Sequence, residues 1–155
     1  MSAMIDILLV EDNLSDAELA MEALRGESVA NRVLHVHDGA EALDFLFSRG
    51  KFSTRDEELP PRLVLLDIKL PKVDGFSVLR EMKQHPATRV IPVVMLTSSN
   101  VERDVALCYR LGVNSYVQKP VDFDQFRQTV QLVGRYWLGV NATPPVSPSD
   151  SGGTQ

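Results

Sequence analysis

The stretch LVLLDIKLP places a carboxylate, Asp67, directly after the aliphatic run Leu63–Leu66. A buried carboxylate without a partner costs free energy comparable to the net stability of a small domain. Either the side chain of Asp67 leaves the core or something binds it there. Three other aliphatic runs are also followed by polar groups: the acid pair Glu11 and Asp12, the hydroxyl of Thr97, and the amine of Lys119.

Together these side chains would suit the transfer of a phosphoryl group. Clustered carboxylates repel one another, and a hard cation such as Mg2+ neutralises them with only one or two carboxylates as ligands. Once its charge is screened, an aspartate can attack phosphorus and form an aspartyl phosphate. Transfer is assisted mainly by positioning and by positive charge near the equatorial oxygens. Mg2+, Lys119 and the Thr97 hydroxyl could each bind one of those oxygens.

The elements that must position these groups are five short apolar runs, which are Ile5–Val10, Val33–His37, Leu63–Leu66, Ile91–Leu96 and Ser115–Gln118. Apolar residues three or four apart predict a helix after each run, over Leu14–Leu24 with Gly26 as its end, Ala40–Phe47, Asp74–Gln84, Val101–Leu111 and Asp122–Leu138. Such alternation predicts an α/β fold, a doubly wound five-stranded parallel sheet with helices on both faces.

In an open parallel sheet, ligands bind outside the carboxyl ends of the strands. The acids, Thr97 and Lys119 all follow strands and therefore meet at one edge, which places Asp67 in a cleft rather than in the core. Taken singly, Asp67 reads as a turn residue, Thr97 as a strand-end hydroxyl and Lys119 as a solvated amine. Their joint arrangement favours a site.

Composition and charge exclude several classes of protein. The net charge is −5 and no Lys/Arg run forms a basic patch, which argues against direct binding to nucleic acid. Cys108 is the single cysteine and reads as a packing residue, so no intrachain disulfide is possible. No apolar run approaches the ~20 residues of a membrane span, and the first residues do not resemble a signal peptide. We expect a cytoplasmic protein that does not bind membranes.

Two segments depart from the strand–helix rhythm. The stretch GKFSTRDEELPP, Gly50–Pro61, reads as a polar loop. Beyond Val140 the chain is rich in Pro, Ser and Gly, which predicts a folded domain over residues 4–140 and a disordered tail over residues 141–155. His35, His37 and His85 match no metal-ligand spacing and read as surface residues.

The motifs LLVEDN, LLDIKLPKVDG, VVMLTS and YVQKP occur in this order between Ile5 and Leu138. Together they resemble the receiver domain of two-component response regulators. The resemblance implies the flavodoxin-like strand order 2-1-3-4-5 and a signalling protein rather than an enzyme. By this resemblance we expect a protein that accepts a phosphoryl group from a histidine kinase and assists only its own phosphorylation and dephosphorylation.

Carried over by residue, the resemblance makes Asp67 the phosphoacceptor. Asp12, Asp67 and the backbone carbonyl of Lys69 become ligands of Mg2+, with Glu11 acting through water. Thr97 becomes the switch hydroxyl, and Tyr116 the aromatic residue that changes rotamer. Lys119 pairs with a phosphoryl oxygen, and the family usually has a cis peptide bond before the proline that here is Pro120.

Partners follow from the same resemblance. The segment Gly50–Pro61 and the stretch RYWLGVN resemble the small single-domain regulators that serve bacterial phytochromes, so a phytochrome-type kinase is one expectation. Output then requires a protein partner, or transfer of the phosphoryl group to a histidine phosphotransfer protein. Tyr136, Trp137 and Leu138 either cover the core or contribute to a homodimer, together with the family's usual signalling face on the fourth helix, fifth strand and fifth helix.

Other classes of protein remain as alternatives. A flavodoxin-type FMN protein would need a phosphate-binding loop after the first strand, where Glu11 and Asp12 would repel a phosphate. A phosphatase with an aspartate nucleophile would want an acid where Lys69 stands. A pseudo-receiver that acts by binding alone would have the fold without phosphorylation.

Overall fold

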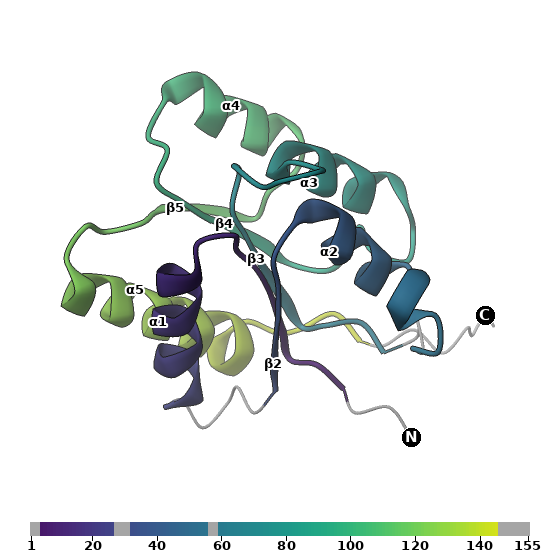
Figure 1. Ribbon diagram of the computed structural model, residues 1–155, viewed down its shortest axis with the longest axis horizontal. Coiled ribbons are helices and arrows are strands. Elements are labelled where there is room, and N and C mark those ends of the chain that lie inside the picture. Colours follow the sequence, from purple (N-terminus) through teal and green to yellow (C-terminus); the bar gives the residue numbers. More distant parts are fainter. Residues whose placement is uncertain (1–3, 27–31, 56–58, 146–155) are drawn as a thin grey trace.

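The centre of the molecule is a sheet of five parallel strands in the order β2-β1-β3-β4-β5 (Figure 1). The computed structural model describes residues 4–26, 32–55 and 59–145. The strands are β1 Ile7–Val10, β2 Val33–Val36, β3 Leu63–Leu66, β4 Val93–Thr97 and β5 Ser115–Gln118. The predicted fold class and strand order are confirmed.

Burial along the strands follows their place in the sheet. Every residue of β1, β3 and β4 is buried, as expected for strands covered on both faces. The outer strands β2 and β5 are mostly half-buried. In register, Val10 lies beside Val36 and Leu66. The residues that follow, Glu11 and Asp67, therefore leave neighbouring strands at the same edge.

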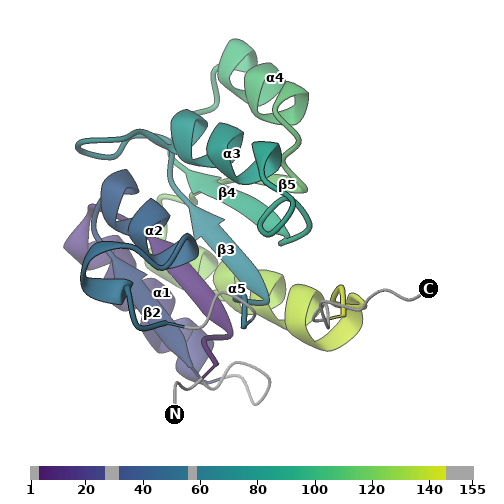
Figure 2. The same cartoon turned by 90° about the vertical axis from the view of Figure 1, so that its right-hand side faces the viewer.

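Helices cover both faces of the sheet (Figures 1 and 2). On one face lie α1 Leu14–Arg25 and α5 Phe123–Arg135, and on the other lie α2 Gly39–Leu46, α3 Gly75–Gln84 and α4 Glu102–Arg110. Four of these helices begin at a residue whose side chain accepts a backbone N–H of the first turn, namely Asn13, Asp38, Asp74 and Asp122. Such caps satisfy amides that have no partner within the helix.

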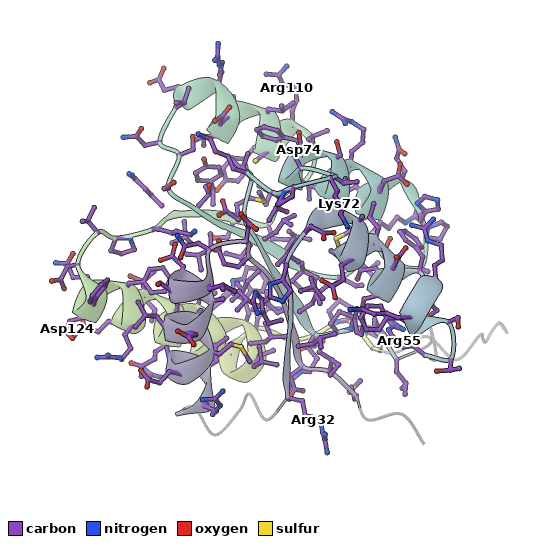
Figure 3. The ribbon with its side chains drawn as sticks, in the orientation of Figure 1. Arg32, Arg55, Lys72, Asp74, Arg110 and Asp124 are labelled. Atoms are coloured by element: carbon purple, nitrogen blue, oxygen red, sulfur yellow. The ribbon has the colours of Figure 1, made fainter. Side chains whose placement is uncertain are left out.

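Two apolar cores lie between these layers, one on each side of the sheet. One joins alternate strand residues to α2, α3 and α4 and includes Cys108, which is fully buried, as expected of a packing residue. The other joins the opposite strand residues to α1 and α5. Figure 3 shows the side chains gathered between the layers, with the labelled charged residues Arg110 and Asp124 on the outside.

The C-terminal end of the last helix covers the core. Beyond α5 the chain continues as η2, a π-helical turn over Tyr136–Val140. Leu138 is buried in the core beneath α1 and α5, and Trp137 packs against it, whereas Tyr136 is exposed. Arg62 donates a hydrogen bond to the carbonyl oxygen of Leu138 at 2.6 Å. Of the two readings of this segment, covering the core therefore holds for Trp137 and Leu138.

Two segments that the sequence marks as irregular are described only in part. Within Gly50–Pro61, a short 3-10 turn, η1 Gly50–Phe52, packs the Phe52 ring edge-on against Phe45 at 5.3 Å, and residues 56–58 lie outside the described residues. The predicted loop therefore begins with a short helical turn that the sequence analysis did not anticipate. Residues 141–145 have no helix or strand, and residues 146–155 of the predicted disordered tail lie outside the described residues. Nowhere in the three described ranges is a helix long and apolar enough to cross a membrane.

One glycine allows the loop after β3 to fold back onto the strand end. A Cβ added at Gly75, the first residue of α3, would lie 2.1 Å from the backbone oxygen of Asp67. The Gly75 amide also donates to the carbonyl oxygen of Ile68 at 2.7 Å. This close approach fixes the backbone on which the Asp67 carboxylate is carried.

We expect Gly75→Ala to lower the free energy of unfolding by at least about 1–3 kcal/mol, because the new methyl group meets backbone rather than a flexible side chain. Urea unfolding measures the change. Gly26→Ala is the matched control, since its Cβ would lie 3.6 Å from the nearest atom and its φ is −74°. Its stability should stay within about 0.5 kcal/mol of the wild type. Equal stability of the two variants would contradict this reading of the loop.

Candidate functional site

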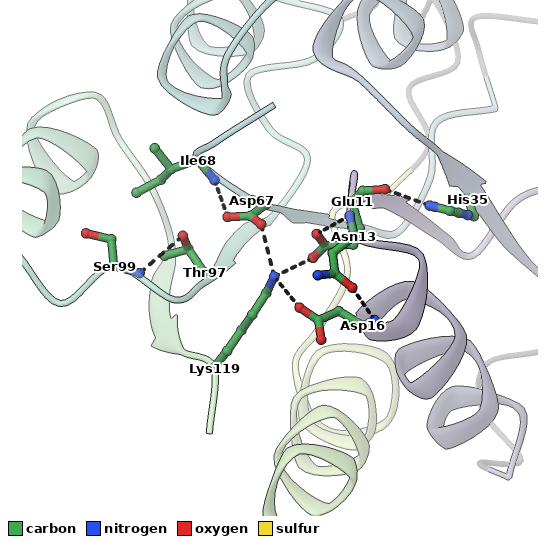
Figure 4. A network of polar contacts seen from close by, with 9 residues as sticks. All are labelled: Glu11, Asn13, Asp16, His35, Asp67, Ile68, Thr97, Ser99 and Lys119. Atoms are coloured by element: carbon green, nitrogen blue, oxygen red, sulfur yellow. Dashed lines mark hydrogen bonds and ion pairs between the residues drawn. The ribbon is translucent and has the colours of Figure 1, made fainter. Parts of the chain in front are cut away.

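The carboxyl ends of the strands bring together four of the residues that the sequence singles out (Figure 4). Glu11 and Asp67 follow β1 and β3, Thr97 ends β4, and Lys119 follows β5. Thr97 lies on one side of Asp67 and Glu11 on the other, with Lys119 reaching between them. Glu11, Asp67 and Thr97 are all buried.

Asp67 remains nearly buried, only 8% exposed, and its two oxygens have different partners. Oδ1 accepts a hydrogen bond from the backbone amide of Ile68 at 2.7 Å. Oδ2 accepts from the ammonium of Lys119 at 3.0 Å. The carboxylate that follows the aliphatic strand is therefore bound where it stands, so it does not carry the cost of an unpaired buried charge.

Lys119 is held at both its ends. Its backbone amide donates to the carbonyl oxygen of Thr97 at 2.8 Å, and its Nζ lies 2.8 Å from Glu11 Oε1, 2.9 Å from Asp16 Oδ2 and 3.0 Å from Asp67 Oδ2. Burial alone would lower the pKa of this amine, but the hydrogen bonds to Glu11 and Asp16 and the charge of Asp67 outweigh it and raise the pKa. Lys119 is therefore a permanent cation.

The expected cis peptide bond before Pro120 is wrong for this structure, because no peptide bond among the described residues is cis. The approach of the lysine is set instead by the backbone contact with Thr97 and by the carboxylates around its ammonium.

Asp16 belongs to the site, although the sequence analysis missed it. It lies in the first turn of α1, where its amide donates to Asn13 Oδ1 at 3.0 Å and its carboxylate reaches Lys119. Its one available signal was its place in the first turn of the helix that follows Glu11 and Asp12. Acidic residues are common in that turn because they complement the helix dipole, so this position by itself would not have selected Asp16.

Burial raises the pKa of the Glu11 carboxyl to about 7, and the nearby charge of Asp67 adds to the shift. The hydrogen bond and charge of Lys119 act in the opposite direction, as does the backbone amide of Asn13, which donates to Glu11 Oε2 at 3.0 Å. Glu11 thus changes its protonation near neutral pH, unlike an ordinary glutamate.

Of the predicted metal ligands, Asp12 and Lys69 are exposed, whereas Asp67 and Glu11 are buried. Asp12 is exposed and lines one hollow together with Lys69, Leu70 and Phe76. No three His, Cys, Asp or Glu side chains in the described part of the chain are close enough to hold a metal by themselves. The available donors are carboxylate and carbonyl oxygens, which suit Mg2+ because it keeps several waters and needs few carboxylates. The residues therefore fit a hard cation.

A chain of contacts leads from Thr97 to the loop that begins α4. The Thr97 hydroxyl lies 3.5 Å from the amide of Ser99, and the Ser99 hydroxyl donates to Asp104 of α4 at 2.7 Å. Tyr116 of β5 is half-buried and donates its hydroxyl to the carbonyl oxygen of Ser99 at 2.9 Å. Burial raises the pKa of the Tyr116 hydroxyl, which keeps it a donor. Sequence reasoning did not find the linking role of Ser99.

The reading of the three histidines as surface residues is wrong for one of them. His37 and His85 are exposed, but His35 is half-buried. Its Nε2 lies 2.8 Å from the backbone oxygen of Glu11, and its ring packs on His37 at 4.4 Å. A residue of β2 thus supports the backbone of the first acid.

Comparison with known proteins adds an independent line of evidence. The family model of the response regulator receiver domain matches residues 7–131. The probable methanogenesis regulatory protein FilR2 of Methanothrix harundinacea is 42% identical over 89% of this chain and 86% of its own length.

Solved structures show the same similarity. The phosphorylated cyanobacterial phytochrome response regulator RcpA is 39% identical, with a TM-score of 0.86 over 92% of this chain and 100% of its own. The Mn2+-bound form of the response regulator Rcp1, a protein of Synechocystis, is 37% identical, with a TM-score of 0.85 over the same shares of the two chains.

The raised pKa of Glu11 makes stability depend on pH. The folded protein keeps this proton up to about pH 7, whereas the unfolded chain releases it near 4.5. The contribution is therefore fully present below pH 4.5 and is lost as the pH rises through 7. We expect the wild type to lose up to about 3 kcal/mol between pH 5 and pH 8 relative to Glu11→Gln.

Urea unfolding at the two pH values, with a chelator present, measures this difference. Glu18→Gln on α1 is the matched control, because Glu18 is exposed and should leave the wild-type dependence unchanged. The same pH dependence in Glu11→Gln and the wild type would rule out Glu11 as its source.

Proposed function

Since this chain belongs to the family of response regulator receiver domains, we propose that it accepts a phosphoryl group from a histidine kinase on Asp67 and signals through a change of conformation. The observation that carries the proposal is the contact of a nearly buried aspartate with a lysine at the carboxyl edge of the sheet. The ammonium of Lys119 partly neutralises this carboxylate, which allows it to approach a negatively charged phosphoryl group.

In the transfer, one carboxylate oxygen of Asp67 forms a bond to phosphorus. The bond from phosphorus to the histidine nitrogen breaks, and its electron pair stays on that nitrogen. Lys119 lies 3.0 Å from the carboxylate and remains cationic, so it can bind an oxygen of the transferred group. Thr97, buried beside Asp67, supplies a hydroxyl on the side away from Glu11. These roles follow the logic of phosphoryl transfer, which depends on positioning and charge.

A divalent cation, which we propose to be Mg2+, would screen the acids and the negative charge of the phosphoryl oxygens when bound. Asp12, Asp67 and the backbone carbonyl of Lys69 would hold it, with Glu11 acting through water. Asp12 and Lys69 line one hollow together with Ile68, the residue that follows Asp67, which supports this set. The similar protein Rcp1 was solved with Mn2+ bound.

The contacts around Ser99 provide a route from the site to the surface. Attraction of the Thr97 hydroxyl to a phosphoryl group would remove its weak contact with the Ser99 amide. The Ser99 carbonyl holds Tyr116, and the Ser99 hydroxyl holds Asp104, so a shift of this loop would reach both β5 and α4. The charge of the phosphoryl group would then favour one of two arrangements of the Ser99 loop, and switch proteins work by such a shift between two states.

The partner that we propose is a phytochrome-type histidine kinase, because the similar protein RcpA is a phytochrome response regulator. The regulator would pass its signal to a downstream protein, or its phosphoryl group to a histidine phosphotransfer protein.

Large apolar side chains are exposed on α4, α5 and the segment that follows, among them Tyr109, Leu132 and Tyr136. Their exposure supports a homodimer through α4, β5, α5 and the C-terminal segment. Sedimentation of the unmodified and phosphorylated protein tests it, and a monomer in both states would exclude it.

Incubation with acetyl phosphate and Mg2+ should add a single phosphoryl group to the wild type, as measured by intact mass. The oxygen of Asp67 replaces acetate on phosphorus, and acetate leaves with the electron pair. Asp67→Asn should form no adduct, because an amide oxygen is a poor nucleophile. A pseudo-receiver would give no adduct in the wild type either, and turnover of a phosphate ester without an adduct would favour a phosphatase.

Thr97→Ala should form the phosphoryl adduct, but the adduct should no longer change the conformation around Ser99 and Tyr116. In the wild type we expect phosphorylation to shift the backbone amide NMR signals of Ser99, Tyr116 and the start of α4. In Thr97→Ala these shifts should be largely lost, since no hydroxyl moves. Ser98→Ala is the matched control, because Ser98 is the next hydroxyl along the chain and is exposed. Wild-type shifts in Thr97→Ala would show that the switch runs through another residue.

A further inference from the structure

The ammonium of Lys119 has no hydrogen-bond donor left for a phosphoryl oxygen. A lysine has three N–H groups, and three carboxylates lie within 3.0 Å of this one: Glu11, Asp16 and Asp67. The lysine side chain is only 9% exposed. Before Lys119 can bind a phosphoryl group on Asp67, it must therefore weaken one of these contacts.

Asp16 is placed by the start of α1 to make one of them. Its backbone amide is fixed by the side chain of Asn13, the N-cap. Side chains on a helix lean toward its N-terminus, so the Asp16 carboxylate extends toward the edge of the sheet where Lys119 ends. Figure 4 shows Asp16 on α1 and Asp67 reaching the ammonium from different elements.

The three contacts are not equally easy to break. Glu11 is 3% exposed, so water cannot replace the lysine there and its carboxyl group would be left buried without a partner. Asp67 carries the incoming group and stays beside the lysine. The Asp16 side chain is 29% exposed, and water can replace the lysine there at little cost. The Asp16 contact is therefore the one that gives way.

We propose that Asp16 is a positioning residue that holds Lys119 in the unphosphorylated protein and competes with the phosphoryl group for its ammonium. The inference rests on the proposed function. On phosphorylation, one N–H group of Lys119 stops donating to Asp16 and donates to a phosphoryl oxygen instead. Asp16 thereby slows the formation of the aspartyl phosphate and shortens its lifetime.

The test compares Asp16→Asn with the wild type in acetyl phosphate and Mg2+, by the rate at which the adduct forms and the rate at which it is lost after the donor is removed. Because an amide holds an ammonium more weakly than a carboxylate does, we expect Asp16→Asn to form the adduct about twofold to fivefold faster and to lose it about twofold to fivefold more slowly. Asp16→Glu, which restores the charge, should return both rates toward the wild type.

Glu18→Gln is the matched control, since it removes one negative charge from an exposed position on the same helix, away from Lys119. It should behave as the wild type does. A readout that needs no phosphorylation is the 1H–15N signal of the Lys119 ammonium, which is visible only when exchange with water is slow. It should weaken in Asp16→Asn and persist in Glu18→Gln. Melting temperatures identify any variant that fails to fold.

Rates in Asp16→Asn equal to those of the wild type, or equal to those of Glu18→Gln, would overturn the proposal. A slower rate of adduct formation would also overturn it, because Asp16 would then orient Lys119 for transfer rather than compete for it. Failure of the proposed function has a different signature, since the wild type itself would then form no adduct.

Discussion

The rest of the site depends on the ammonium of Lys119, because it compensates the negative charge of the carboxylates around it. Glu11 and Asp67 directly follow two neighbouring central strands, and both are almost fully buried. Without a cation between them, two adjacent carboxylates in this position would repel each other and lack solvent. The lysine lies within 3.0 Å of both. A single positive charge therefore allows an acidic site to exist at the edge of an otherwise apolar sheet.

The same contacts connect the phosphoryl-binding residues to the surface of the protein. The backbone of Lys119 is tied to Thr97 at the end of β4, and Thr97 leads through Ser99 to Tyr116 and α4. A group that displaces the lysine or attracts the threonine disturbs a connected set of contacts rather than an isolated side chain. Buried polar networks of this kind respond as units, because each member has few alternative partners.

The apolar layers provide the rigid frame for these contacts. The core beneath α1 and α5 extends to Trp137 and Leu138, and Arg62 fastens the end of this segment to the start of β3. On the other face, glycine at position 75 lets the loop after β3 approach the backbone of Asp67. The strand that carries Asp67 thus lies between two packed cores, and the carboxylate itself is held by Ile68 and Lys119.

The sequence by itself determined the elements, their order and the type of chemistry. In alternation with helical segments, short aliphatic runs such as Leu63–Leu66 predict strands buried on both faces, and the polar groups that follow several such parallel strands then meet at one edge. The motifs around Asp67 and Lys119 then predict the family and the strand order, both of which are confirmed. Local pattern suffices for these features because burial and periodicity decide them.

Only the tertiary structure decided which residues contact Lys119, Ser99 and Glu11. Asp16 and Lys119 are 103 positions apart, and their contact depends on how α1 packs against the sheet. The same holds for the link of Ser99 to Tyr116, the support of Glu11 by His35, and the lysine's approach without a cis bond before Pro120. Each of these groups has several acceptable partners, and only the packed geometry selects among them.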